Sequence, residues 1–151
     1  MNIEEIQNQI ASRVIKFNAW HKEQKKMYLA EELGQDQMTL MPDGRGFVNI
    51  SSAHTRFSQI DSGRKMIPLQ YIGRTDSEGK ELYHGDIIET YCSFQSKIIR
   101  GWIESSFGGF RLEGPIFDLG GIDNAWFGPL TKVGTIFENP ELLKGLEEWE
   151  S

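Results

Sequence analysis

The sequence has little of what secreted domains, membrane proteins and metalloenzymes usually carry. Its one cysteine, Cys92, cannot form an internal disulfide. No apolar run approaches the ~18 residues of a membrane span, and no stretch has the form of a signal peptide. The three histidines, His21, His54 and His84, are far apart and lack the spacing of metal ligands. These absences favour a cytoplasmic location, and the sequence predicts no catalytic, cofactor or metal site.

Positive charge is also scarce. Lys and Arg number 16 against 22 Asp and Glu, which gives a formal net charge of −6. A protein that coats nucleic acid usually has a basic excess, because binding to phosphate releases counterions. The charge is uneven, however, with lysines early in the chain and glutamates near its end. A local basic face therefore stays open as an alternative.

The chain has the composition of one folded domain. It has 151 residues, of which 38% are hydrophobic and 11% aromatic, which is too apolar for a disordered chain. We find no long linker and no internal repeat. The prediction is a single domain, residues 1–151, with a seam that separates an N-terminal β region (14–66), a barrel (67–138) and a C-terminal helix (139–150).

Short strands separated by turn residues dominate the sequence. The clearest run is 68–88, in which turn residues at 76–79 and 84–86 separate three short extended segments. Segment 115–123 is glycine-rich and is expected to be irregular, and 51–64 is expected to be a polar loop. The other predicted strands are 14–20, 27–30, a hairpin within 38–50 around Pro42, Asp43 and Gly44, and 87–94, 97–105, 110–112 and 130–137.

A short helix is predicted at each end. Asn2 can cap a helix over residues 2–11, in which Ile3, Ile6 and Ile10 have helical spacing. Such a stripe is more typical of a helix that covers the core of its own domain than of a docking surface, and the sequence leaves the choice open. Near the other end, Asn139 as N-cap and Pro140 at the first helical position predict a helix to about residue 149.

Several motifs together resemble a known family. They are the runs Ile-Lys-Phe-Asn-Ala-Trp at 15–20, Leu-Gln-Tyr-Ile-Gly at 69–73, Gly-Lys-Glu-Leu-Tyr at 79–83, Gly-Asp-Ile-Ile at 85–88 and Gly-Thr-Ile-Phe-Glu-Asn-Pro-Glu at 134–141. In this order they resemble the YopX-like proteins of phages and prophages. The resemblance implies a mainly β (α+β) fold with a small SH3-like β-barrel and a phage or prophage context. It implies no biochemical activity, so no functional residue is carried over.

Reaction chemistry has weak support in the sequence. His84 and Asp86 could act as a base and its orienting carboxylate in a small hydrolase or transferase. Across Gly85 they are more typical of a turn in which Asp86 accepts local backbone N–H groups. Cys92, in a predicted strand, is more typical of a small buried hydrophobic residue than of a nucleophile. A non-catalytic role is therefore favoured.

The aromatic residues suggest a binding surface. They are more numerous than a small barrel interior takes, and the candidate surface comprises Arg100, Trp102, Arg111, Trp126 and Phe127. Trp126 and Phe127 precede a Gly-Pro turn and form the favoured exposed patch. The surface could bind a protein partner, form a homo-oligomeric interface, or stack nucleic-acid bases beside the arginines. The favoured function is a phage-encoded protein-interaction module, with a nucleic-acid-binding barrel as the alternative.

Overall fold

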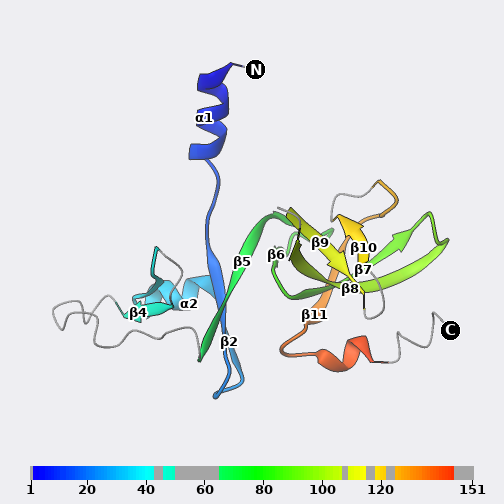
Figure 1. Cartoon of the computed structure of the whole chain (residues 1–151). Helices are drawn as coiled ribbons and strands as arrows, with labels where there is room; N and C mark the ends of the chain where they lie inside the picture. Colours follow the sequence, from blue (N-terminus) through cyan, green and yellow to red (C-terminus); the bar gives the residue numbers. More distant parts are fainter. Residues whose placement is uncertain are drawn as a thin grey trace.

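A computed structural model of the chain describes residues 2–42, 46–49, 65–106, 109–114, 118–121 and 125–144. Over these residues the fold is mainly β, as predicted (Figure 1). The helices are α1 (Ile3–Ala11), α2 (Ala30–Gln35) and the 3-10 helix η2 (Pro140–Leu143). The strands are β1 (Phe17–His21), β2 (Lys26–Tyr28), β3 (Met38–Leu40), β4 (Phe47–Asn49), β5 (Met66–Thr75), β6 (Glu81–Tyr83), β7 (Asp86–Cys92), β8 (Lys97–Ser106), β9 (Gly109–Glu113), β10 (Asp118–Gly121) and β11 (Thr131–Thr135).

These strands form two larger sheets and a hairpin. The first sheet has the order β2-β1-β5-β6, the second has the order β10-β9-β8-β7-β11, and β3 pairs with β4. The paired strands in all three are antiparallel. The five-stranded sheet curls on itself (Figure 1). A mostly consecutive strand order of this kind follows from the short turns that separate the strands in the sequence.

Strand β5 joins the two halves of the molecule. Its first half pairs with β1, where Phe17 faces Gln70, and its second half pairs with β6, where Tyr71 faces Tyr83. The β5–β6 register shifts between Tyr71 and Thr75, and Gly73 lies in that interval with a φ of 88° that favours glycine. Strand β5 is therefore an interior strand of the first sheet and belongs to both halves.

Each half has its own hydrophobic cluster. Ala19, Leu33, Phe47 and Met66 form the smaller cluster beside α2 and the β3–β4 hairpin. The larger cluster fills the curled sheet, and its buried members are Leu82, Ile88, Cys92, Ile99, Ile103, Leu112 and Leu130. In β8 the residues Ile99, Gly101 and Ile103 are buried, as their alternation predicts. The intervening residues of β8 therefore form the outer face of the sheet.

Two segments differ from the sequence prediction. The expected strand 27–30 ends at Tyr28, and helix α2 begins at Ala30. The side-chain oxygen of Asn18 accepts the Ala30 N–H at 2.9 Å, and Leu33 packs into the smaller cluster, so tertiary contacts decide this helix. In the segment expected to be irregular, β10 pairs with β9 at the edge of the sheet, with a register shift between Asp118 and Gly120 of the kind that glycine in a strand often marks.

The predicted start of the C-terminal helix is confirmed, but the expected capping bond is not. Asn139 is the N-cap residue of η2 and Pro140 opens the helix, yet the Asn139 side chain makes no hydrogen bond to that helix. Its Oδ1 instead accepts the N–H of Thr135 at 3.2 Å, which closes the turn after β11. The helix that follows is the short 3-10 helix η2, and the rest of the predicted helix, 145–149, lies outside the described residues, as do the turn 43–45 and the loop 51–64.

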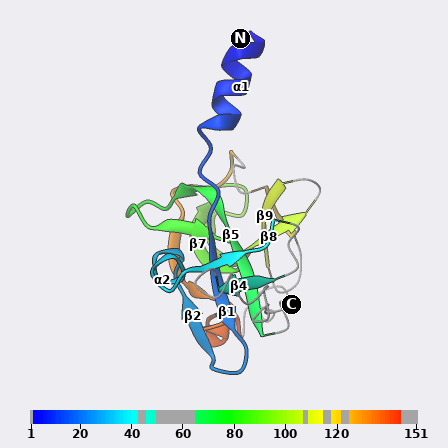
Figure 2. The ribbon, with the colours of Figure 1, turned by 90° about the vertical axis from the view of Figure 1, so that its left-hand side faces the viewer.

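The predicted N-terminal cap is confirmed, but the predicted packing is not. Asn2 Oδ1 accepts the N–H of Glu5 at 2.9 Å, and α1 then runs to Ala11. The structure describes every residue of α1 and buries none of them. Both views show α1 extending away from the rest of the chain (Figures 1 and 2). Its isoleucine stripe therefore does not cover the core of its own domain.

None of the helices in the described ranges is long and apolar enough to cross a membrane.

Candidate functional site

Among the described residues, an exposed aromatic cluster lies at the end of the β7–β8 hairpin. Phe94 lies in the turn and stacks on Trp126, with ring centroids 4.7 Å apart and an angle of 26° between the planes. The two residues are 71% and 51% exposed. Tyr91 and Ile98 face each other across β7 and β8 at the same end, and both are exposed. We call Tyr91, Phe94, Ile98 and Trp126 the aromatic hairpin end.

Backbone hydrogen bonds fix Trp126 at this position. The carbonyl of Trp126 accepts the N–H of Ser93 at 2.8 Å, and the N–H of Gly128 donates to the carbonyl of Tyr91 at 2.8 Å. Phe127 lies between them and forms an isolated antiparallel bridge with Cys92. The Phe127 side chain is half-buried against the larger hydrophobic cluster. Of the two residues of the predicted patch, Trp126 is thus exposed while Phe127 anchors the segment.

The other predicted surface residues lie together on the outer face of the sheet. Arg100 and Trp102 alternate with the buried residues of β8, and Arg111 is next to buried Leu112 in β9. The register places Trp102 opposite Glu113 and Arg111 opposite Glu104. The structure therefore brings Arg100, Trp102 and Arg111 to one face.

Glutamates balance the arginines on this face. The guanidinium of Arg100 contacts Glu89 Oε2 through Nη2 at 2.6 Å and through Nε at 3.2 Å, and its Nη1 donates to the Leu142 carbonyl at 2.8 Å. Arg111 faces Glu104 across the strands. A face that alternates charge in this way does not present the basic excess that phosphate binding requires. Arg100 instead holds η2 against the sheet.

His84 and Asp86 do not form a catalytic pair. His84 Nε2 lies 2.9 Å from Glu104 Oε1, and Glu104 Oε2 accepts the indole N–H of Trp102 at 3.3 Å. Burial raises the pKa of Glu104, but the bonds from His84 and Trp102 outweigh it, so the pKa of this carboxyl is lowered overall. Asp86 faces elsewhere, toward Lys132. The two residues thus belong to separate networks.

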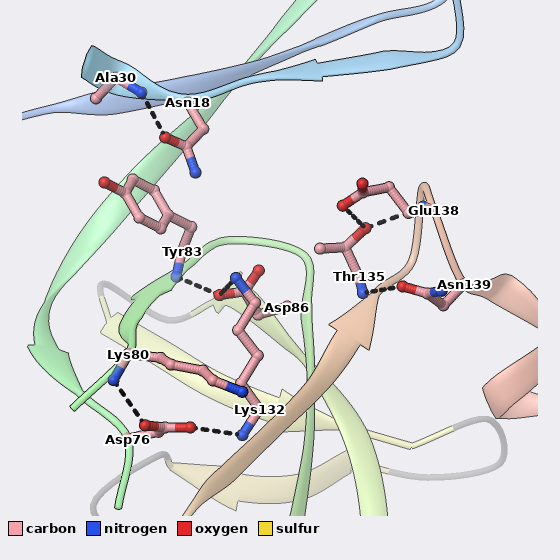
Figure 3. A network of polar contacts seen from close by, with 10 residues as sticks. All are labelled: Asn18, Ala30, Asp76, Lys80, Tyr83, Asp86, Lys132, Thr135, Glu138 and Asn139. Atoms are coloured by element: carbon pink, nitrogen blue, oxygen red, sulfur yellow. Dashed lines mark hydrogen bonds and ion pairs between the residues drawn. The ribbon is translucent and has the colours of Figure 1, made fainter. Parts of the chain in front are cut away.

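Asp86 is the centre of a buried polar network (Figure 3). It is 2% exposed, its Oδ2 accepts the Tyr83 N–H at 2.8 Å, and Lys132 Nζ lies 3.2 Å from the same oxygen. The bond to Tyr83 is the turn interaction that the sequence predicts. Burial raises the pKa of Asp86 to about 6, although Lys132 and the Tyr83 N–H lower it.

A cavity of about 590 Å³ lies beside this network, between residues of the two halves. Its lining includes Lys16 and Asn18 from one side and Lys80, Tyr83 and Lys132 from the other. Burial and the nearby Glu81 raise the pKa of Tyr83 to about 12, so its hydroxyl is neutral at physiological pH. Each lysine has a carboxylate partner, which is Glu81 for Lys16, Glu78 for Lys80 and Asp86 for Lys132. The cavity is thus charge-compensated.

No group of three His, Cys, Asp or Glu side chains among the described residues could hold a metal ion. His54 lies outside these residues, and Cys92 is buried as the sequence predicts.

A comparison with protein families identifies the chain. The profile described as "YopX protein" matches residues 16–144. The chain belongs to the YopX family. This match begins after α1, so the helix stands before the part that defines the family. A search of curated proteins finds no match for this YopX-family chain.

A solved structure has the same fold as this YopX-family chain. It is the crystal structure of protein EF1440 from Enterococcus faecalis, with 22% sequence identity and a TM-score of 0.57. The similarity covers 88% of this chain and 100% of that one. At this identity the similarity concerns the fold alone.

Sequence reasoning missed three members of the aromatic hairpin end, namely Tyr91, Phe94 and Ile98. Phe94 carried a usable signal, because a phenylalanine between Ser93 and the strand that starts at Lys97 lies in a predicted hairpin turn, where burial is rare. Ile98 carried a weaker signal. It precedes Ile99 in a predicted strand, and consecutive side chains of a strand point to opposite faces, so Ile98 faces away from the core. The pairing of Phe94 with Trp126 had no local signal, because the two are distant in sequence.

Proposed function

We propose that this YopX-family chain is a non-catalytic protein-interaction module that binds a partner protein through the aromatic hairpin end. The stacked, exposed pair of Phe94 and Trp126 carries this proposal. Aromatic side chains are enriched at the centres of protein interfaces, where they bury a large area at a low cost in side-chain entropy. A partner that covers this pair would remove it from water.

The neighbouring outer face supports a polar rim around this centre. Arg100, Trp102 and Arg111 lie on the same sheet. Glu89 is the cross-strand neighbour of Arg100, and Glu104 is that of Arg111. Charged residues of both signs at the rim of an interface increase its specificity and its association rate more than they increase its affinity. Such a surface suits a partner with its own alternating charges better than a polyanion.

The biological setting is part of the same proposal. The family resemblance supports a phage- or prophage-encoded protein that acts in the cytoplasm of the host cell. The buried thiol of Cys92 is compatible with a reducing compartment. The curled five-stranded sheet would serve as a small SH3-like barrel that presents the β7–β8 hairpin.

A paired capture experiment tests the proposal. The full chain and the variant Phe94→Ser with Trp126→Ser are immobilised and exposed to lysate of the host, before and after phage induction. We expect a protein that the unmodified chain retains and the double variant loses. The matched control is Val133→Ser, which replaces another exposed apolar residue, on β11, and should retain the partner.

Direct binding then decides between the two function classes. The captured protein is purified and titrated against both variants, while labelled single-stranded and duplex DNA are titrated in parallel at low and physiological salt. Equal retention by the double variant would contradict the proposed surface. Salt-sensitive DNA binding that depends on Arg100 and Arg111 would favour the nucleic-acid alternative instead.

A further inference from the structure

Helix α1 has an apolar face that none of the described residues covers. Ile3, Ile6 and Ile10 are 69%, 39% and 61% exposed. Val14 and Ile15, in the chain that follows the helix, are also exposed, at 57% and 60%. A large exposed apolar surface marks an interaction site. An isolated helix of nine residues is also marginal in water, so contact with a partner would stabilise it.

The same chain carries a groove with a partly apolar lining at the foot of this helix. The groove has a volume of about 270 Å³. Its apolar part is supplied by the chain after α1, by α2 and by the β3–β4 hairpin, and includes Ile15, Phe17, Leu33, Met38, Leu40 and Phe47. We call this the α2 groove. The isoleucine stripe can therefore lie against the apolar part of the α2 groove.

Charge does not oppose this pairing. The first turn of α1 carries Glu4 and Glu5, and the helix has no basic residue in its last turn. The charged residue among those lining the α2 groove is Lys16, whose ammonium group also contacts Glu81. An acidic helix end can thus approach the lining of the groove without facing a like charge there.

The helix is poorly placed to enter the groove of its own chain. Ile15 forms part of the groove wall, and the Lys16 carbonyl accepts the Tyr71 N–H at 3.0 Å, which fixes the chain there. Ser12, Arg13 and Val14 alone separate α1 from this wall, and three residues span at most about 11 Å. The helix would have to reverse direction within them, and they include neither glycine nor proline.

We propose that two copies of the chain exchange their N-terminal helices, with α1 of each copy lying in the α2 groove of the other. The helix of a second copy is free of the short connection that restrains the chain's own helix. Reciprocal exchange is a closed twofold arrangement, in which every contact occurs twice. The exchange makes two helix–groove contacts. It therefore buries more surface than a single contact between two nine-residue helices would, and a stable dimer needs a large buried surface.

Sedimentation velocity of the full chain over a range of concentrations tests the helix side. We expect a monomer–dimer equilibrium that Ile6→Asp weakens by roughly tenfold or more, because it places a carboxylate in the apolar contact. Asn8→Asp is the matched control, since it adds the same charge to the opposite face of α1 and should leave the equilibrium unchanged.

The groove side has its own matched pair. Gly34 lines the α2 groove, and a Cβ atom built there meets nothing within 4 Å, so substitution should leave the fold intact. Gly34→Glu adds bulk and a charge that opposes Glu4 and Glu5, and we expect it to weaken the dimer. Gly34→Ala should not. Thermal unfolding of each variant checks that the monomer still folds.

Mixing the two disruptive variants distinguishes exchange from other dimers. Ile6→Asp retains an intact groove and Gly34→Glu retains an intact helix, so a mixed dimer regains one complete contact. We expect fluorescently labelled Ile6→Asp to sediment as a dimer with excess Gly34→Glu, at concentrations where each alone is monomeric.

Three results would overturn the exchange. The first is a chain that stays monomeric at every concentration. The second is a dimer weakened by Ile6→Asp but not by Gly34→Glu, because the helices would then pair with each other. The third is a dimer that neither substitution affects, which would place the interface elsewhere.

Discussion

Asp76 holds the backbone of Lys132, a residue 56 positions away in the sequence (Figure 3). Asp76 Oδ2 accepts the Lys132 N–H at 3.0 Å, while Oδ1 accepts the N–H groups of Glu78 at 2.9 Å and of Lys80 at 2.8 Å. One carboxylate therefore closes the β5–β6 turn and joins it to β11. Burial raises the pKa of Asp76, but these bonds and the charge of Lys80 outweigh it and lower the pKa overall.

Asp76→Ala should destabilise the chain by about 3 kcal/mol, because three backbone N–H groups lose a charged acceptor. Urea unfolding at pH 7 measures this. Since the native pKa of Asp76 is below its ordinary value of 3.8, its contribution is complete above that pH and is lost as the pH falls through the native pKa. The variant should thus approach the unmodified chain in acid. Ser77→Ala, at an exposed neighbouring position, loses only one neutral hydroxyl contact, with Thr131 at 3.2 Å, and should cost less than about 1 kcal/mol.

Asp86 should show the opposite dependence on pH. Its native pKa of about 6 exceeds its ordinary 3.8, so between these values the folded chain binds more protons than the unfolded one. Stability due to Asp86 should therefore fall as pH rises from 4 to 6, by about 2 to 3 kcal/mol in total. Asp86→Asn should abolish this part of the profile while retaining an acceptor for the Tyr83 N–H.

The measurement is the free energy of unfolding from pH 3 to pH 8 for both chains, taken as a difference at each pH. A difference that does not change between pH 4 and pH 6 would show that the buried carboxyl titrates normally.

Gly134 should not accept a side chain. A Cβ atom there would lie 2.5 Å from Asn139 Oδ1 and 2.9 Å from Asn139 Cβ. Gly134→Ala should displace Asn139 from the Thr135 N–H and destabilise the chain by about 1 to 3 kcal/mol in thermal or urea unfolding. Adding Asn139→Ala should make the two effects less than additive, since it removes the clashing Oδ1 and Cγ atoms and leaves only the Cβ contact at 2.9 Å. Gly34→Ala, in open space within α2, should instead be neutral or stabilising by up to about 1 kcal/mol.

Arg100→Lys should loosen η2 from the sheet. A lysine cannot contact Glu89 with two nitrogens and also donate to the Leu142 carbonyl, as the guanidinium does. We expect faster amide hydrogen exchange in residues 139–144 and a loss of about 1 to 2 kcal/mol in stability. Arg13→Lys, on the exposed chain after α1, is the control and should change neither. Unchanged exchange in Arg100→Lys would mean that η2 is held by other contacts.

Local signals in the sequence predict most of the strands. The alternation of Ile99, Gly101 and Ile103 predicts β8 and its buried face, and the turn residues around Gly79 and Gly85 place β5, β6 and β7 in order. Asn2 predicts the start of α1. Each of these signals acts within a few residues, so it is present in the chain before any tertiary contact forms.

The candidate sites depend on contacts between distant residues, which local signals do not contain. Helix α2 forms where Asn18 accepts the N–H of its first residue, the Asn139 side chain accepts the Thr135 N–H rather than an N–H of η2, and Phe94 stacks on Trp126 at the end of a hairpin. The sequence alone thus determined a mainly β chain with capped turns and an apolar N-terminal stripe. The tertiary structure decided which arginines are paired with carboxylates, which aromatic rings stay in water and that none of the described residues covers α1, because burial and charge pairing are properties of the assembled sheets.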